Sequence, residues 1–156
     1  MLTGAIVVAA VLAAATVGGL AMRRRGGRLA GPRRAASRQP ALTSARLGQP
    51  LGSRATLLQF SSSFCAPCRA AQQLLADVAA RNAGVAHVEI DVADRLDLVR
   101  LLSVRRAPTV FVLGPRGEIV RRASGLPRRE DVLAAVAAAA GGLAAGQGSD
   151  RPHGLA

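Results

Sequence analysis

The sequence predicts an α/β domain whose sheet mixes parallel and antiparallel strands, preceded by one transmembrane helix. Short apolar runs typical of strands alternate with segments of helical periodicity, which predicts the α/β class. A Gly-Pro-Arg-Gly turn at residues 114–117 separates two of the apolar runs and indicates an antiparallel hairpin. The transmembrane helix is predicted from the stretch Leu2 to Met22, which contains no charged side chain.

The opening stretch is long enough to cross a bilayer. At ~1.5 Å rise per residue, its 21 residues form a helix of about 31 Å, close to the hydrocarbon thickness. A cleavable signal peptide would begin with a basic residue and contain a shorter apolar stretch. Here the stretch has no basic start and runs directly into Arg23, Arg24 and Arg25. We therefore predict that residues 1–22 are a retained anchor.

Arginines after the anchor predict its orientation. Seven Arg and no acidic residue lie between residues 23 and 38, and short basic segments stay on the cytoplasmic side. The expected product is a single-pass protein of the cell membrane whose C-terminal domain faces the cytoplasm. Residues 23–50 contain Gly, Pro, Ser and Arg with little apolar periodicity, and are predicted as a basic linker.

The net charge of +12 raises the question of nucleic-acid binding. No aromatic residue lies within the Arg-rich runs, so they offer no platform for base stacking. Nucleic acid is therefore not expected as a partner. As a separate expectation, the domain is predicted to be monomeric.

Seven elements are expected within a domain at residues 51–140. Strands are predicted at 55–60, 85–92, 109–113 and 118–123, and helices at 65–82, 94–103 and 127–140. The first helix should end at Gly84, and Pro127 should open the last. Three apolar residues in each helix are expected to face the sheet: Leu74, Leu75 and Val78; Leu96, Val99 and Leu102; Val132, Leu133 and Val136. Residues 141–156 are predicted as a disordered tail.

The only two cysteines lie where the first strand passes into the first helix. Free backbone N–H groups and the helix dipole at that position favour a thiolate on Cys65, which makes it the attacking sulfur. Cys68 lies about one turn further on and can resolve a mixed disulfide by intramolecular attack. Pro67 is tolerated because early helical N–H groups have no partner to lose. This pattern predicts a dithiol/disulfide redox centre with no other cofactor.

The cysteines allow two other interpretations. Zinc needs about four N or S ligands, and the sequence adds only His87, within a strand pattern, and His153, near the C-terminus. We therefore expect no metal, and no catalytic role for His87. A purely structural disulfide is also open, although a bridge closing so short a loop constrains the unfolded chain little.

From about residue 55 to 140 the sequence resembles a thioredoxin domain of a membrane-anchored bacterial protein. Residues 64–69 read F-C-A-P-C-R where that family has W-C-G-P-C-K, and residues 107–109 read A-P-T where it has I-P-T. Gly117-Glu118 and Gly125 also match. The resemblance implies a three-layer fold with a central mixed sheet. It also implies a cis Pro108 opposite the sulfurs and a substrate surface formed by seven residues: Phe64, Ala66, Pro67, Ala107, Pro108, Thr109 and Gly125.

Three departures from the family pattern bear on chemistry. Phe64 replaces a Trp and loses an indole N–H, and Ala66 replaces a Gly between the cysteines. Gln59 falls where the family has a buried Asp that helps to move the proton of the second cysteine. Because Gln does not titrate, water or another group must assist Cys68, and Asp91 at a strand end is one candidate.

The resemblance implies a membrane-tethered thiol–disulfide oxidoreductase, with protein disulfides as substrates and a thiol as electron donor. A variant with the opposite topology would handle disulfides or cytochrome maturation outside the cytoplasm. A third interpretation is a docking module with incidental cysteines, against which the complete C-x-P-C motif argues.

Overall fold

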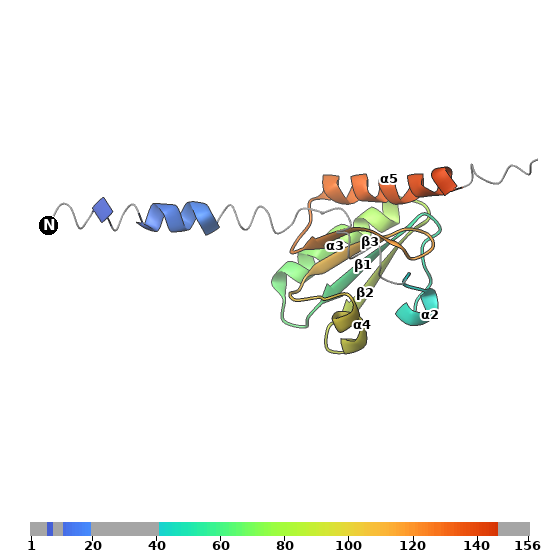
Figure 1. Cartoon of the computed structure of the whole chain (residues 1–156), viewed down its shortest axis with the longest axis horizontal. Helices are drawn as coiled ribbons and strands as arrows, with labels where there is room; N and C mark the ends of the chain where they lie inside the picture. Colours follow the sequence, from blue (N-terminus) through green and yellow to red (C-terminus); the bar gives the residue numbers. More distant parts are fainter. Residues whose placement is uncertain (1–5, 8–10, 20–40, 147–156) are drawn as a thin grey trace, which may run out of the picture.

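A four-stranded mixed sheet in the order β2-β1-β3-β4 forms the centre of the domain (Figure 1). β1 (Ala55–Ser61) pairs in parallel with β2 (Val85–Asp91) and antiparallel with β3 (Thr109–Leu113). β3 pairs antiparallel with β4 (Ile119–Ser124), which confirms the predicted hairpin. The predicted mixed sheet is therefore confirmed.

The computed structural model describes residues 6–7, 11–19 and 41–146. Residues 6–7 and 11–19 are helical, with exposed apolar side chains. No helix within the described ranges is long and apolar enough to span a membrane. Much of the anchor predicted at 1–22, the linker residues 23–40 and the tail residues 147–156 lie outside the described residues.

Helices cover both faces of the sheet (Figure 1). α3 (Ala66–Arg81) and α5 (Arg129–Gly146) lie on one face, over a core that includes Leu57, Leu75 and Val132. α4 (Leu96–Leu101) and α2 (Ser44–Leu47) lie on the other, over a core that includes Phe60 and Leu98. Because β1 is central in the sheet and covered on both faces, all seven of its residues are buried. The three-layer expectation is confirmed.

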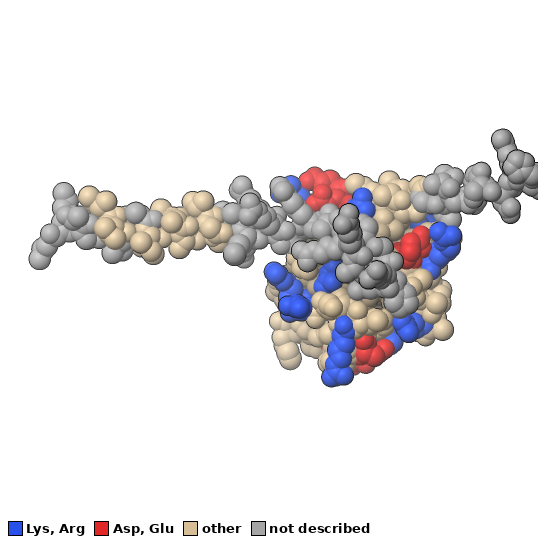
Figure 2. All heavy atoms as spheres, viewed as in Figure 1, with Lys and Arg blue, Asp and Glu red and all other residues tan. Residues whose placement is uncertain are grey.

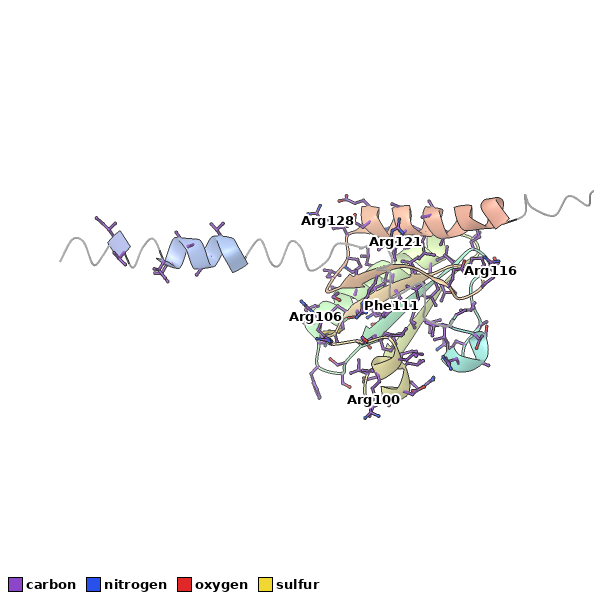
Figure 3. All side chains as sticks on the ribbon, in the orientation of Figure 1. Arg100, Arg106, Phe111, Arg116, Arg121 and Arg128 are labelled. Carbon is purple, nitrogen blue, oxygen red and sulfur yellow. A yellow bond between two sulfur atoms is a disulfide. The ribbon has the colours of Figure 1, made fainter. Side chains whose placement is uncertain are left out.

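The three phenylalanines divide between core and surface. Phe60 on β1 and Phe111 on β3 meet edge to face with ring centroids 5.9 Å apart, and both are buried. The guanidinium of Arg122 on β4 lies 5.0 Å from the centre of the Phe111 ring (Figure 3 labels Phe111). Phe64, in contrast, is fully exposed. The other buried hydrophobic side chains are mainly those of Leu, Val and Ala.

Residues 41–50 belong to the domain, which corrects the predicted linker boundary at residue 50. Leu42 and Leu47 are buried in the core on the α2 side of the sheet. The backbone N–H of Leu42 donates to the carbonyl of Gly117 in the hairpin turn at 2.9 Å. A Cβ on Gly117, whose φ is +81°, would lie 2.1 Å from the Leu42 carbonyl oxygen. The prediction was wrong here because two isolated leucines show no periodicity.

Several details of the helices also differ from the predictions. Of the residues predicted to face the sheet from α4, Leu102 is buried and Val99 packs against the core, but Leu96 is exposed. Leu98, which was not predicted, is buried. In α5, Val132 and Val136 are buried but Leu133 is partly exposed. α5 begins at Arg129, two residues after Pro127, and continues to Gly146, beyond the end predicted at 140. The Ala-rich composition of this segment favours the longer helix.

Candidate active site

Cys65 and Cys68 form a disulfide at the junction of β1 and α3. Their Cα atoms are 5.1 Å apart and the S–S distance is 2.16 Å. Cys65 is the N-cap of α3, and its Sγ accepts from the backbone N–H of Cys68 at 3.2 Å. Its backbone carbonyl accepts from the N–H groups of Cys68 and Arg69. The first turn of the helix therefore directs N–H groups at Cys65, as a cap requires.

The two cysteines differ in their access to solvent. Cys68 is buried, with 3% of its surface exposed, whereas Cys65 is half-buried. Three of the predicted substrate-surface residues, Phe64, Ala66 and Pro67, are exposed beside them. An incoming disulfide can therefore reach Cys65 more easily than Cys68, which supports the predicted order of attack.

Gln59 lies beneath the second cysteine, as the alignment of β1 predicts. Its side chain is fully buried, and Nε2 donates to the backbone carbonyl of Cys68 at 3.0 Å. Its Oε1 lies 3.3 Å from Nε2 of His87 on β2. Because an amide oxygen only accepts, His87 must donate this hydrogen bond. Gln59 thus has partners at both ends of its amide.

His87 has a structural role that sequence reasoning missed. Its ring is half-buried, and this burial lowers its pKa below the usual value of 6.5, while the charge of Glu89 acts in the opposite direction. The parallel register pairs Gln59 with Glu89, so Gln59, His87 and Glu89 share the face of the sheet under α3. The alternation of β2 places His87 and Glu89 on one face of that strand, but only the pairing of β1 with β2 shows that Gln59 lies beside them.

The loop before β3 lies at the same end of the sheet as Cys65. Thr109 pairs with Phe60, near the end of β1, so the residues before Thr109 adjoin the segment that leads to Cys65. The Ala107–Pro108 peptide bond is cis, as the resemblance implied. Figure 3 shows Arg106 at this end of the domain, where its carbonyl accepts from Thr109 Oγ1 at 2.7 Å.

Gly125, which follows β4, is hydrogen-bonded to the loop that contains Pro108. Its backbone N–H donates to the carbonyl of Pro108 at 2.7 Å, and its φ of +99° is one that favours glycine. Ser124, the residue before it, pairs with Thr109. The fold therefore brings Pro108, Thr109 and Gly125 to the end of the sheet where Cys65 lies.

A polar cavity of about 330 Å³ opens beside the disulfide. Both cysteines and the serines 61–63 line it, together with four longer polar side chains: Arg69, Gln72, Glu89 and Asp91. The Asp91 carboxylate accepts from Ser63 Oγ at 3.1 Å and from the N–H of Ala93 at 2.9 Å. The cavity is thus open to solvent beside the redox centre, and two carboxylates line it.

Metal ligands do not gather in the part of the chain that the structure describes, since no three His, Cys, Asp or Glu side chains there could hold an ion. His153 of the zinc interpretation lies outside the described residues. Basic and acidic side chains are interspersed on the face of the domain shown in Figure 2.

Comparison with known proteins places this geometry in a family. The thioredoxin family model matches residues 43–139. Thioredoxin H2-1 of Oryza sativa subsp. japonica is 34% identical over 74 residues, which cover 47% of this chain and 53% of that protein. Thioredoxin H5 of the same organism is 31% identical over 72 residues, covering 46% and 53%. The chain spans about half the length of these curated relatives.

Solved structures show the same fold. A mutant thioredoxin from Halobacterium salinarum NRC-1 aligns with a TM-score of 0.50 and 25% identity, covering 56% of this chain and 76% of that one. Thioredoxin F from spinach chloroplast aligns with a TM-score of 0.50 and 24% identity, covering 56% and 78%. Because the family model covers well over half of the 156 residues, this chain belongs to the thioredoxin family.

Proposed function

We propose that this protein is a thiol–disulfide oxidoreductase that exchanges disulfides with protein substrates through Cys65 and Cys68. The observation that carries the proposal is the Cys65–Cys68 disulfide at the N-terminus of α3, with one accessible and one buried sulfur. A reversible bridge in such a position can pass two electrons to or from another disulfide. The cysteine pair is then the redox group, and no separate cofactor is needed.

The reaction follows from the different exposure of the two sulfurs. In the reduced protein, the Cys65 thiolate attacks a substrate disulfide, forms a mixed disulfide and releases one substrate thiol. Cys68 then loses its proton and attacks Cys65 Sγ, which forms the Cys65–Cys68 bond and releases the second substrate thiol. The substrate disulfide is reduced and the dithiol is oxidised. A thiol electron donor must reduce the protein again before the next turnover.

Exposed residues around Cys65 supply the substrate surface of this proposal. Phe64 offers an exposed aromatic side chain directly before the reactive cysteine. Ala107 precedes the first residue of β3 by two positions, where its backbone is suited to pair with an extended substrate segment. Substrates are therefore proposed to be proteins with a disulfide in an accessible, extended segment.

Single-turnover reduction of a protein disulfide tests the proposal. The reduced full chain, freed of excess reductant, should reduce an accessible disulfide in a model protein at one equivalent per dithiol. The Cys65→Ser variant should lose this activity because the attacking sulfur is absent. Turnover by Cys65→Ser at the wild-type rate would overturn the assignment, and a wild-type chain that reduces no disulfide would favour the docking-module interpretation.

A membrane tether is the second part of the proposal. Residues 2–22 contain no charged side chain, and the described part of this segment is helical with exposed, uncharged side chains (Figure 2). The following Arg-rich segment supports a domain on the cytoplasmic side of the membrane.

Labelling of Cys65 in intact cells tests the topology. After reduction with a permeant thiol, a membrane-impermeant thiol reagent should label the cysteines only when the cells are lysed. Labelling without lysis would place the domain outside the cytoplasm, as the envelope interpretation requires. Recovery of the chain in the soluble fraction after salt washing would contradict the tether itself.

A further inference from the structure

Cys68 must lose its proton before it can resolve a mixed disulfide, because the thiolate is the attacking species. The buried side chain nearest to its backbone on β1 is Gln59, which donates to the Cys68 carbonyl and does not titrate. The proton must therefore leave toward another group. The cavity beside the disulfide provides the route, because both cysteines line it and it is wide enough for water.

Glu89 is the carboxylate placed to receive this proton. It lines the cavity together with both cysteines. The β1–β2 register sets it directly beside Gln59, on the face of the sheet under α3. Among the described residues, none donates a hydrogen bond to its carboxylate. Its oxygens are therefore free to accept from water in the cavity.

The other polar groups around the cavity are less suited. Asp91 already accepts two hydrogen bonds, from Ser63 and Ala93, which hold the loop at the end of β1. His87 donates through Nε2 to Gln59 and is absent from the cavity lining. Arg69 lines the cavity but a guanidinium has no acceptor atom.

We propose that the Glu89 carboxylate accepts the Cys68 proton, through water in the cavity, as Cys68 attacks the mixed disulfide on Cys65. This inference rests on the proposed function. The S–H bond of Cys68 breaks, its proton passes by way of water to Glu89, and the resulting thiolate forms the bond to Cys65 Sγ. The substrate sulfur leaves with the electron pair of the mixed disulfide. When the protein instead oxidises a substrate, Glu89 returns the proton.

The titratable or charged groups around Glu89 are His87 and Asp91 on β2 and Arg69 on α3, while β1 presents the neutral Gln59. Glu89 could also affect Cys68 only through its negative charge. Such a charge would disfavour the nearby Cys68 thiolate, so its removal would speed resolution of the mixed disulfide. A proton acceptor predicts the reverse sign.

Stopped-flow reaction of the reduced full chain with 5,5′-dithiobis(2-nitrobenzoate) separates the two steps. The first nitrothiobenzoate is released when Cys65 attacks the reagent, and the second when Cys68 resolves the mixed disulfide. In the Glu89→Gln variant the second release should slow about tenfold near pH 7. The first release should stay within about twofold of wild type, because Glu89 takes no part in the attack by Cys65.

Two further variants serve as controls. Glu89→Asp keeps a carboxylate and should recover most of the rate of the second release. Asp91→Asn, which changes the other carboxylate of the cavity, tests the alternative acceptor and should slow the second release less than Glu89→Gln does.

A second release in Glu89→Gln that is equal to or faster than in wild type would overturn the inference. So would a tenfold loss in Asp91→Asn with no loss in Glu89→Gln. Neither result would affect the proposed function, which instead fails if the wild-type chain releases no second nitrothiobenzoate.

Discussion

Gln59 of β1 donates a hydrogen bond of 3.0 Å to the backbone carbonyl of Cys68, in the first turn of α3. The contact joins the central strand β1 to the helix that carries the resolving sulfur, which is the buried sulfur of the disulfide. Since Gln59 also accepts from His87, its amide orientation is fixed at both ends. The position under the redox centre is thus polar, neutral and fully satisfied.

Replacing Gln59 with Asp should destabilise the reduced domain by roughly 2 kcal/mol or more at neutral pH, because a carboxylate cannot donate to Cys68 and must be buried. The same variant should resolve mixed disulfides faster, since it places a proton acceptor near Cys68. Denaturant unfolding and stopped-flow exchange measure the two effects. Gln59→Asn, of equal size to Asp but uncharged, is the control. An Asp variant with unchanged stability and rate would contradict the buried position of Gln59.

His87 should make stability depend on pH in a defined window. Burial lowers its pKa below 6.5, so the folded protein keeps the ring neutral where the unfolded chain already binds a proton. Its contribution is therefore present above about pH 6.5 and is lost as the pH falls toward the folded-state pKa. As the pH is lowered from about 7 to 5, the free energy of unfolding should decrease less steeply in His87→Gln than in wild type. Parallel curves for the two proteins would contradict this assignment.

Leu42 should contribute to stability although it lies before the first strand. Because its side chain is fully buried, Leu42→Ala should cost about 2 to 5 kcal/mol in denaturant unfolding. Leu133→Ala, on the partly exposed side of α5, is the matched control and should cost under about 1 kcal/mol. A shortened chain that begins at Thr43 should be destabilised like Leu42→Ala. A loss for Leu42→Ala as small as that predicted for Leu133→Ala would contradict the contribution of Leu42 to the core.

The sequence was most informative where one local signal dominates. β1 and β3 are continuous apolar runs bounded by polar or turn residues, and their predicted positions match the structure closely. The turn at residues 114–117 specified the hairpin for the same reason. The site at Cys65 and Cys68 was identifiable because a strand, a turn and a helix start coincide there.

Other features depended on packing that no local pattern contains. In and just after α4, the spacing of Leu96, Val99 and Leu102 fits one face of a helix. The spacing of Leu98 and Leu102, the two leucines that are fully buried, fits a helical face equally well. The contact of His87 with Gln59 depends on the register between two strands. Without that register, an alternating strand gives no reason to assign His87 a partner.

The trapping of a mixed disulfide tests the central claim most directly. The full chain with Cys68→Ser, reduced and then mixed with a protein that contains an accessible disulfide, should accumulate a covalent complex through Cys65. Electrophoresis without reductant should reveal the complex, and dithiothreitol should cleave its disulfide and release the two proteins. The wild-type chain should show little of it because Cys68 resolves the bond. If Cys65→Ser, which keeps Cys68, traps the same protein to the same extent, Cys65 is not the attacking sulfur and the account is wrong.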